Sequence, residues 1–240
     1  MTSVAKRGTR GKFITFEGLD GSGKTTHVEK LAEVLRQDGI DVVTTREPGG
    51  TEIGERIRAV LLDSRTAGLD AYAEMALMFA SRAQQIAQVI LPALEAGQWV
   101  LCDRFTDSTE AYQGGGRQLG SAVVLRCHEV ICRGLWPDLT ILLNTDVTSS
   151  VARARRRNKA AAHAAAATIA GSTHGAIQPD EGRFEKESGA FFSRVRGAFL
   201  DLARREPQRV VVVDARPTVD MVHPEIVRVV RERLMKGAQH

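Results

Sequence analysis

The sequence reads Gly18-Leu19-Asp20-Gly21-Ser22-Gly23-Lys24-Thr25 near its start, and this octapeptide fits the pattern G-x-x-x-x-G-K-[ST] at every fixed position. A β-prone run at residues 13–16 comes directly before it, and apolar residues recur at helical spacing over residues 28–35. Strand, loop and helix is the order that a phosphate-binding loop requires. We therefore predict such a loop here, in preference to a glycine-rich turn that matches the pattern by chance.

Each residue type in this loop has a chemical reason. Glycine lacks a Cβ, so a phosphate can lie against backbone N–H groups, and the N-terminus of the following helix adds positive partial charge. We expect Lys24 to reach the β- and γ-phosphates of a nucleotide, and Thr25 and Asp103 to hold Mg²⁺, with Asp103 as a direct or indirect ligand. The residues expected to bind ATP here are Gly18, Asp20, Gly21, Ser22, Gly23, Lys24, Thr25 and Thr26.

Length and pattern predict one α/β domain over residues 1–240. The chain has 240 residues, of which 43% are hydrophobic, enough for one sizeable core. Apolar strands alternating with helices form a parallel sheet whose two faces are both covered, so we expect a five-stranded parallel sheet with helices on both faces. The predicted strands are 13–16, 40–45, 98–102, 139–143 and 210–213, and the main predicted helices are 71–94, 121–135, 148–157 and 221–234.

Composition argues against several other classes of protein. No run of about eighteen apolar residues occurs and the basic N-terminus has no apolar segment, so we expect a soluble, cytoplasmic protein without membrane contact. Cys102, Cys127 and Cys132 lack zinc-site spacing and are expected to be reduced thiols. The net charge of +4 is compatible with nucleic acid, but aromatic residues make up only 5% and a small polyanion explains the charge at least as well.

Two further loops are expected at the carboxyl ends of strands, where open α/β sheets bind ligands. Residues 46–50 read Arg-Glu-Pro-Gly-Gly, a shaped turn that either holds a ligand or simply connects two elements. Residues 103–105 read Asp-Arg-Phe, which brings an acid and a guanidinium beside the phosphate-binding loop.

Two stretches on the later helices are candidates for ligand contacts. Phe79 and Arg82 are three residues apart and share a helix face, which suits a ring stacked on a base and a guanidinium at its carbonyl edge. From spacing alone, however, a core Phe and a solvated Arg is the preferred interpretation. Residues 106–118 contain three consecutive glycines, and we predict a flexible, polar segment that a ligand uses.

The regular pattern breaks at about residues 159–178, which are rich in alanine with scattered Gly and Ser. An isolated helix shorter than about 12–15 residues is marginal in water, and this one has no large apolar residues to dock. We predict a mobile lid over about 153–185 that contains this insertion.

In its motifs the chain closely resembles the bacterial thymidylate kinase family, over nearly its whole length. The resemblance implies the fold of P-loop nucleoside monophosphate kinases and transfer of the γ-phosphoryl group of ATP to dTMP, giving dTDP and ADP on the route to dTTP, with Mg²⁺. It also implies a homodimer. The stretches that carry the resemblance are Phe16–Thr26, Arg46–Thr51, Asp103–Phe105, Ala111–Arg117 and Arg183–Glu185.

The resemblance also assigns roles to single residues. It places Asp20 near the sugar 3′-hydroxyl, Arg104 on the acceptor phosphate, Phe79 on the face of thymine, Arg82 at the base edge, and Tyr112 under the deoxyribose. Ala215 and Arg216 would hold the adenine of ATP. The residues assigned to catalysis are Lys24, Arg104, Arg183 and Asp20, and those assigned to the substrate are Asp20, Glu47, Pro48, Phe79, Arg82, Arg104, Ser108, Thr109, Tyr112 and Gln113.

The chain departs from part of the family at Gly21, where some relatives carry a catalytic arginine in the phosphate-binding loop. The transferred phosphoryl group must then be held from elsewhere, and we expect an arginine of the lid to do this. Arg183 is the first candidate and Arg153 the second.

Three alternatives remain beside a thymidylate kinase. A GTP-dependent switch protein is disfavoured, because the chain's Asn158-Lys159 is followed by two alanines in place of the guanine-selecting N-K-x-D pattern. Nucleic-acid binding through the basic run 153–159 is the second alternative. A kinase for a different nucleotide or nucleoside is the third, because a few side chains decide which base is accepted.

Overall fold

The computed structural model describes residues 10–66, 68–156, 160 and 182–235 of the chain. The predicted insertion at about 159–178 lies outside these residues apart from Ala160, and so does most of the predicted lid. In the described part, every helix is too short or too polar to cross a membrane.

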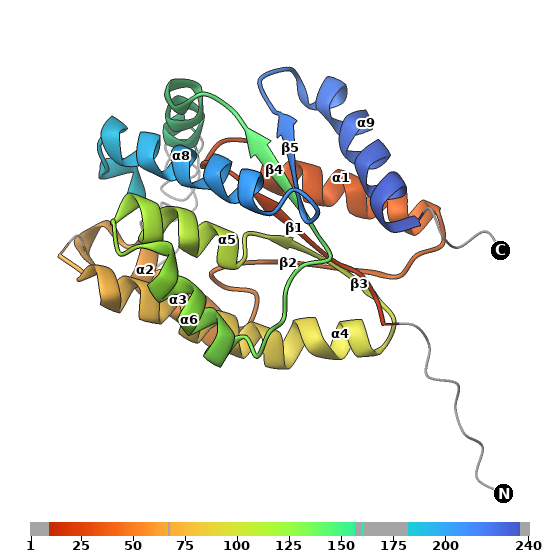
Figure 1. Ribbon diagram of the computed structural model, residues 1–240, viewed down its shortest axis with the longest axis horizontal. Helices are drawn as coiled ribbons and strands as arrows, with labels where there is room; N and C mark the ends of the chain where they lie inside the picture. Colours follow the sequence, from red (N-terminus) through yellow and green to blue (C-terminus); the bar gives the residue numbers. More distant parts are fainter. Residues whose placement is uncertain (1–9, 67, 157–159, 161–181, 236–240) are drawn as a thin grey trace, which may run out of the picture.

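One five-stranded sheet, with every pairing parallel, runs through the centre in the order β2-β3-β1-β4-β5 (Figure 1). The predicted parallel architecture is confirmed, with strand ends that differ by one or two residues. β1 is central, so the loop that follows it emerges between the ends of β3 and β4. The strands are β1 (Phe13–Glu17), β2 (Val42–Arg46), β3 (Trp99–Asp103), β4 (Leu139–Asn144) and β5 (Val210–Asp214).

Helices connect the strands, and residues 147–156 form one further helical segment. Thr51 caps α2 by accepting from the Gly54 N–H, and Asp70 caps α3 in the same way. The labelled helices are α1 (Lys24–Gln37), α2 (Glu52–Leu62), α3 (Ala71–Gln85), α4 (Leu91–Glu95), α5 (Thr106–Thr109), α6 (Ser121–Ile131), α8 (Gly189–Arg205) and α9 (Val219–Val230). Short 3-10 turns are η1 (Ser64–Thr66) and η4 (Phe184–Lys186), and π-helical turns are η2 (Ile86–Ile90), η3 (Glu110–Gly116) and η5 (Arg231–Met235).

Helices cover both faces of the sheet (Figure 1). Successive strand residues point to opposite faces, so Ile14 and Phe16 pack with α1 and α9, whereas Phe13 packs with α3, α4 and α6. Over β4 and β5, Leu142 and Val210 pack against α8, on the face opposite to α1. This two-sided burial explains why the strands read as apolar runs.

The glycine-rich stretch after Asp103 differs from its prediction. Residues 106–116 are helical and mostly buried, instead of flexible and polar. A Cβ on Gly115 would lie 2.6 Å from Cβ of Ala198, and one on Gly116 would lie 2.6 Å from a ring carbon of Phe191. The glycines are therefore needed for the close approach of α8, a contact with a distant segment that local composition does not reveal.

Candidate active site

The phosphate-binding loop lies between the end of β1 and the start of α1, as predicted. Lys24 is buried, and its Nζ donates to the carbonyl oxygens of Gly18 and Leu19 at 3.2 and 2.9 Å. Burial, with a smaller contribution from the Arg104 charge, lowers the pKa of Lys24 to about 8. A phosphate bound in the loop would provide a counter-charge for this buried ammonium.

Thr25 and Asp103 lie together at the same place. The Thr25 hydroxyl donates to Oδ2 of Asp103 at 2.6 Å, and both residues line the cavity above the loop. A hydroxyl and a carboxylate are hard oxygen donors of the kind that Mg²⁺ prefers, so the two residues fit the predicted metal site.

Two adjoining cavities occupy this edge of the sheet. The larger, of about 580 Å³, lies over the phosphate-binding loop and reaches Arg153. The smaller, of about 100 Å³, lies between α2, α3 and the α5–η3 segment. We call them the phosphate cavity and the base cavity. The residues that line both are Asp20, Glu47, Arg58 and Arg104.

Arg104 stands at the boundary between the cavities. Its backbone is left-handed, with φ of 73°, which is rare for a residue other than glycine. Nη1 donates to the Gly18 carbonyl at 3.0 Å and to Ser108 Oγ at 2.7 Å. Nη2 donates to Asp20 Oδ1 at 2.7 Å and to the Tyr112 hydroxyl at 3.1 Å. The strain and the four contacts together fix the guanidinium between the two cavities.

Arg82 is buried in the wall of the base cavity, so the preferred sequence interpretation of a solvated arginine is wrong. Its Nε donates to Glu47 Oε2 at 2.6 Å and its Nη2 to Thr109 Oγ1 at 2.9 Å. Burial outweighs the Arg82 charge and raises the pKa of Glu47 to about 7. Among the described residues no hydrogen-bond partner is found for Arg82 Nη1 or Glu47 Oε1, and both atoms are buried.

Phe79 does not line either cavity. It is completely buried in the core under β1 and β3, and the Arg82 guanidinium carbon lies 4.8 Å from its ring centroid. The neighbouring Met78 lines the base cavity instead. The predicted stacking role of Phe79 therefore has no support in this placement, whereas a core Phe agrees with the alternative.

Gln113 and Tyr112 approach the base cavity from η3. Gln113 Nε2 donates to the buried carboxylate of Glu74 at 2.6 Å. Since a carboxylate only accepts, this bond fixes the amide with its NH₂ group toward Glu74. The Tyr112 hydroxyl donates to Asp20 Oδ2 at 3.2 Å, and its ring packs edge-on against Phe184 at 5.7 Å.

The two candidate lid arginines have different surroundings. Arg183 is buried and donates to Glu74 Oε2 and to the Leu61 carbonyl, and it lines neither cavity. Arg153 lines the phosphate cavity and donates to Thr145 Oγ1 at 2.9 Å. A Cβ on Gly21 would lie 3.1 Å from the Cβ of Arg153, so the small residue in the loop lets the helix at 147–156 approach it. The structure thus places the second candidate, Arg153, at the phosphate cavity.

The predicted adenine loop lies at the carboxyl end of β5, and its residues Ala215 and Arg216 line neither cavity. The Ala215 N–H donates to the Asn144 carbonyl at 2.9 Å, and the exposed Arg216 pairs with Asp214 at 2.7 Å. The other predicted residues of the site that line one of the two cavities are Gly21, Gly23, Thr26, Pro48, Ser108 and Thr109. Ser22 is buried within the loop, and Gly18 lines a separate small cavity against β4.

Arg58, Leu62 and Met78 line the base cavity without being among the residues predicted from the sequence. Arg58 also donates to the Pro48 carbonyl at 3.0 Å. Arg58 and Leu62 are four residues apart and share a face of α2, but the same spacing is found in any helix packed on a core.

Comparison with known proteins agrees with this geometry. The family model described as "Thymidylate kinase" matches residues 16–226. A thymidylate kinase from Thiobacillus denitrificans is 46% identical over 222 residues, covering 92% of this chain and 97% of the relative. One from Desulfovibrio desulfuricans is 47% identical over 211 residues, covering 88% and 91%. The crystal structure of thymidylate kinase from Ehrlichia chaffeensis is similar with a TM-score of 0.70 at 31% identity, covering 92% of this chain and 99% of that one. The chain belongs to the thymidylate kinase family.

Proposed function

We propose that this kinase transfers the γ-phosphoryl group of ATP to the 5′-phosphate of dTMP, with ATP in the phosphate cavity and the nucleoside of dTMP in the base cavity. The observation that carries the proposal is the shared wall: Arg104 and Asp20 line both cavities, so two anionic ligands would meet at one guanidinium. Such a junction suits transfer between two phosphates, because the reaction needs positioning and charge neutralisation more than covalent chemistry.

Each charged group then has one task. Lys24 holds the donor phosphates, Arg104 holds the acceptor phosphate, and Arg153 reaches the phosphoryl group in transfer. We prefer Arg153 to Arg183 for this last role because Arg183 is turned to Glu74. Thr25 and Asp103 would hold Mg²⁺, which supplies positive charge to the donor phosphates.

Base selection follows from hydrogen-bond polarity. Arg82 offers donors to an exocyclic carbonyl oxygen, as in thymine, and opposes the amino group that cytosine carries at the same position. Gln113 turns its NH₂ group toward Glu74, so its carbonyl oxygen is free to accept the N3–H of thymine. Met78 packs on the face of the base, which is the role that the resemblance assigns to Phe79.

Sugar selection is assigned to Tyr112. Its hydroxyl is fixed by Arg104 and Asp20, and its ring by Phe184, so the ring cannot move away from a bulkier sugar. We expect a preference for deoxyribose over ribose on the order of 10–200-fold, the usual range for a small steric difference in a pocket.

The experiment is a comparison of turnover for dTMP, dUMP, dCMP, UMP and thymidine with ATP and Mg²⁺, with Lys24→Ala as the inactive control. We expect dTMP to be the best substrate, dCMP and UMP to be poor, and thymidine to be inactive because it has no acceptor phosphate. A preference for thymidine or for dCMP would overturn the proposal.

We propose further that the chain acts as a homodimer in the cytoplasm. Apolar side chains on α2 and α3 are exposed, with Ile53 at 50%, Val60 at 46% and Tyr72 at 56%, which supports a contact through these helices. The three cysteines are free thiols, in keeping with a reducing compartment. Light scattering of Tyr72→Glu against the wild type tests the interface.

A further inference from the structure

We propose that Glu17 is a positioning residue for Arg104: its buried carboxyl fixes the guanidinium through Ser108 and the backbone through the amide of Phe105. The inference rests on the proposed function, in which Arg104 holds the acceptor phosphate. Glu17 itself lines neither the phosphate cavity nor the base cavity.

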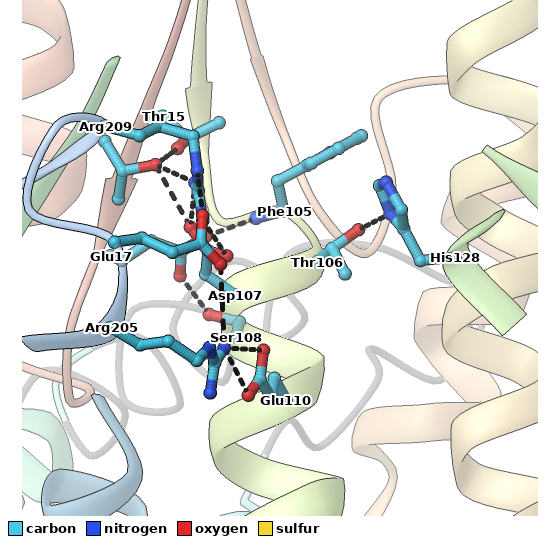
Figure 2. Close-up of polar contacts among 12 residues, drawn as sticks. Thr15, Glu17, Phe105, Thr106, Asp107, Ser108, Glu110, His128, Arg205 and Arg209 are labelled. Carbon is cyan, nitrogen blue, oxygen red and sulfur yellow. Dashed lines mark hydrogen bonds and ion pairs between the residues drawn. The ribbon is translucent and has the colours of Figure 1, made fainter. Parts of the chain in front are cut away.

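The contacts form a short chain from the end of β1 to the guanidinium. Glu17 Oε1 accepts from the Phe105 N–H at 2.7 Å, and Oε2 accepts from the Ser108 hydroxyl at 2.5 Å (Figure 2). Ser108 Oγ in turn accepts from Arg104 Nη1 at 2.7 Å. The Ser108 hydroxyl has one hydrogen and donates it to Glu17, so toward Arg104 it can only accept. The hydrogen bonds therefore run in one direction, from Arg104 through Ser108 to Glu17.

The contact with Phe105 supports the unusual backbone of Arg104. Arg104 is left-handed, and Phe105 precedes α5 without a side-chain cap of its own. Glu17 satisfies the first amide after the strained residue and so fixes the peptide that leaves it. Both the backbone and the side chain of Arg104 are thereby tied to one carboxyl.

A carboxyl in this place is costly for the fold. Glu17 has no exposed surface, and burial together with the nearby Asp107 raises its pKa to about 8. Asp107, one position before Ser108, instead pairs with Arg209 at 2.6 Å (Figure 2). Two buried carboxyls thus lie next to the same helix. In the described part of the chain, Glu17 contacts Ser108 and through it Arg104, whereas Asp107 contacts Arg209 and Thr140.

The test compares Glu17→Gln with Asp107→Asn. Glutamine has the same shape, but its NH₂ group donates to Ser108 and competes with the donor from Arg104. We expect KM for dTMP to rise about 10-fold in Glu17→Gln, as for loss of a hydrogen bond to a charged group, with KM for ATP within about twofold of the wild type. Asp107→Asn should lower the midpoint of unfolding and leave KM for dTMP unchanged.

A double variant tests whether Glu17 acts through Ser108. In a Ser108→Ala background, Glu17→Gln should raise KM for dTMP much less than it does in the wild type.

Several outcomes would overturn the inference. If Glu17→Gln alters stability alone, or raises both KM values equally, Glu17 is a structural residue. Glu17→Asp keeps the carboxyl group and shortens its reach, so it should show the same selective rise in KM for dTMP. If both variants unfold, the role of Glu17 is stability. A wild-type enzyme that does not phosphorylate dTMP would contradict the proposed function, whereas a wild type active on dTMP with an unchanged KM in Glu17→Gln would contradict only this inference.

Discussion

The Nε atom of Arg82 lies 2.6 Å from Oε2 of Glu47, and the two side chains are 2% and 3% exposed. The pair joins the loop after β2 to α3, and the guanidinium also lies against the ring of Phe105, 5.1 Å from its centroid. Charges at this depth are stable only when they are paired, because the interior does not replace the water that each has lost. The pair therefore forms a fixed part of the wall of the base cavity.

Glu47→Leu should destabilise the protein by about 3–5 kcal/mol, because it leaves a buried guanidinium without its counter-charge. Adding Arg82→Met should recover much of that loss, since two apolar side chains replace the pair, but should not recover turnover of dTMP. Urea unfolding and steady-state kinetics on the single and double variants check both statements. A double variant with normal kcat/KM for dTMP would show that Arg82 does not read the base.

The sheet and the phosphate-binding loop were predictable because their signals are local. A strand, a glycine pattern and a helix follow one another within residues 13–37, and buried parallel strands are apolar throughout. The placement of Lys24, Thr25 and Asp103 followed from the same order of elements. Their distances in the structure agree with that expectation.

The lining of the base cavity was not predictable, because it depends on which residue of a helix faces the cavity. Met78 and Phe79 are adjacent, and their distances of four and three residues from Arg82 place both near its face. Only packing against the sheet decides that Phe79 is buried and Met78 lines the cavity. The burial of Arg183 was not predictable either, because its partner Glu74 is 109 residues away in the sequence.

ATP affinity should fall as the pH rises above about 8, because Lys24 loses its proton with a pKa of about 8 in the unliganded protein. The protonated form binds the phosphates, so affinity is fully present below that pKa and is lost above it, by at most about tenfold per pH unit. Calorimetric titration of ATP between about pH 7 and 9.5 measures the effect. Lys24→Met should bind ATP weakly at every pH. If its ATP affinity fell with pH as much as that of the wild type, another group would be responsible for the titration.

Acid should destabilise the protein partly through His128. Burial, with the charges of Arg82 and Arg209, lowers its pKa to about 4 against an ordinary value of 6.5, so the folded state binds the proton less readily than the unfolded one. This contribution to stability is present above about pH 6.5 and is lost as the pH falls toward about 4, by at most about 1.4 kcal/mol per pH unit. Urea unfolding at several pH values measures how the free energy of unfolding changes with pH, and this change should be smaller for His128→Gln than for the wild type. Equal changes in the two proteins would contradict the assignment to His128.

Gly116→Ala should destabilise the protein by about 1–3 kcal/mol, because the added methyl group would lie 2.6 Å from the Phe191 ring and force α8 away. The matched control is Gly114→Ala in the same segment, where the nearest atoms would be 3.6 Å away, an ordinary contact. We expect the control to stay within about 1 kcal/mol of the wild type, since alanine also favours helix. Equal losses in the two variants would show that the segment tolerates no side chain for reasons of backbone shape instead of packing.

Arg153 and Arg183 should separate catalysis from stability. Arg153 faces the phosphate cavity, so Arg153→Ala should lower kcat by at least about 10²-fold with the fold intact, as expected for a group that stabilises charge in the transition state. Arg156 is an exposed arginine on the same helical segment, so Arg156→Ala is the control for a general loss of positive charge and should keep the wild-type kcat.

Arg183→Ala removes a buried donor from Glu74 and should lower the free energy of unfolding by about 1–3 kcal/mol, with a smaller effect on kcat than Arg153→Ala. Single-turnover rates and urea unfolding on the three variants distinguish the roles. If Arg183→Ala lost more turnover than Arg153→Ala at a temperature where both are folded, the transferred phosphoryl group would be held by Arg183, which would first have to leave Glu74.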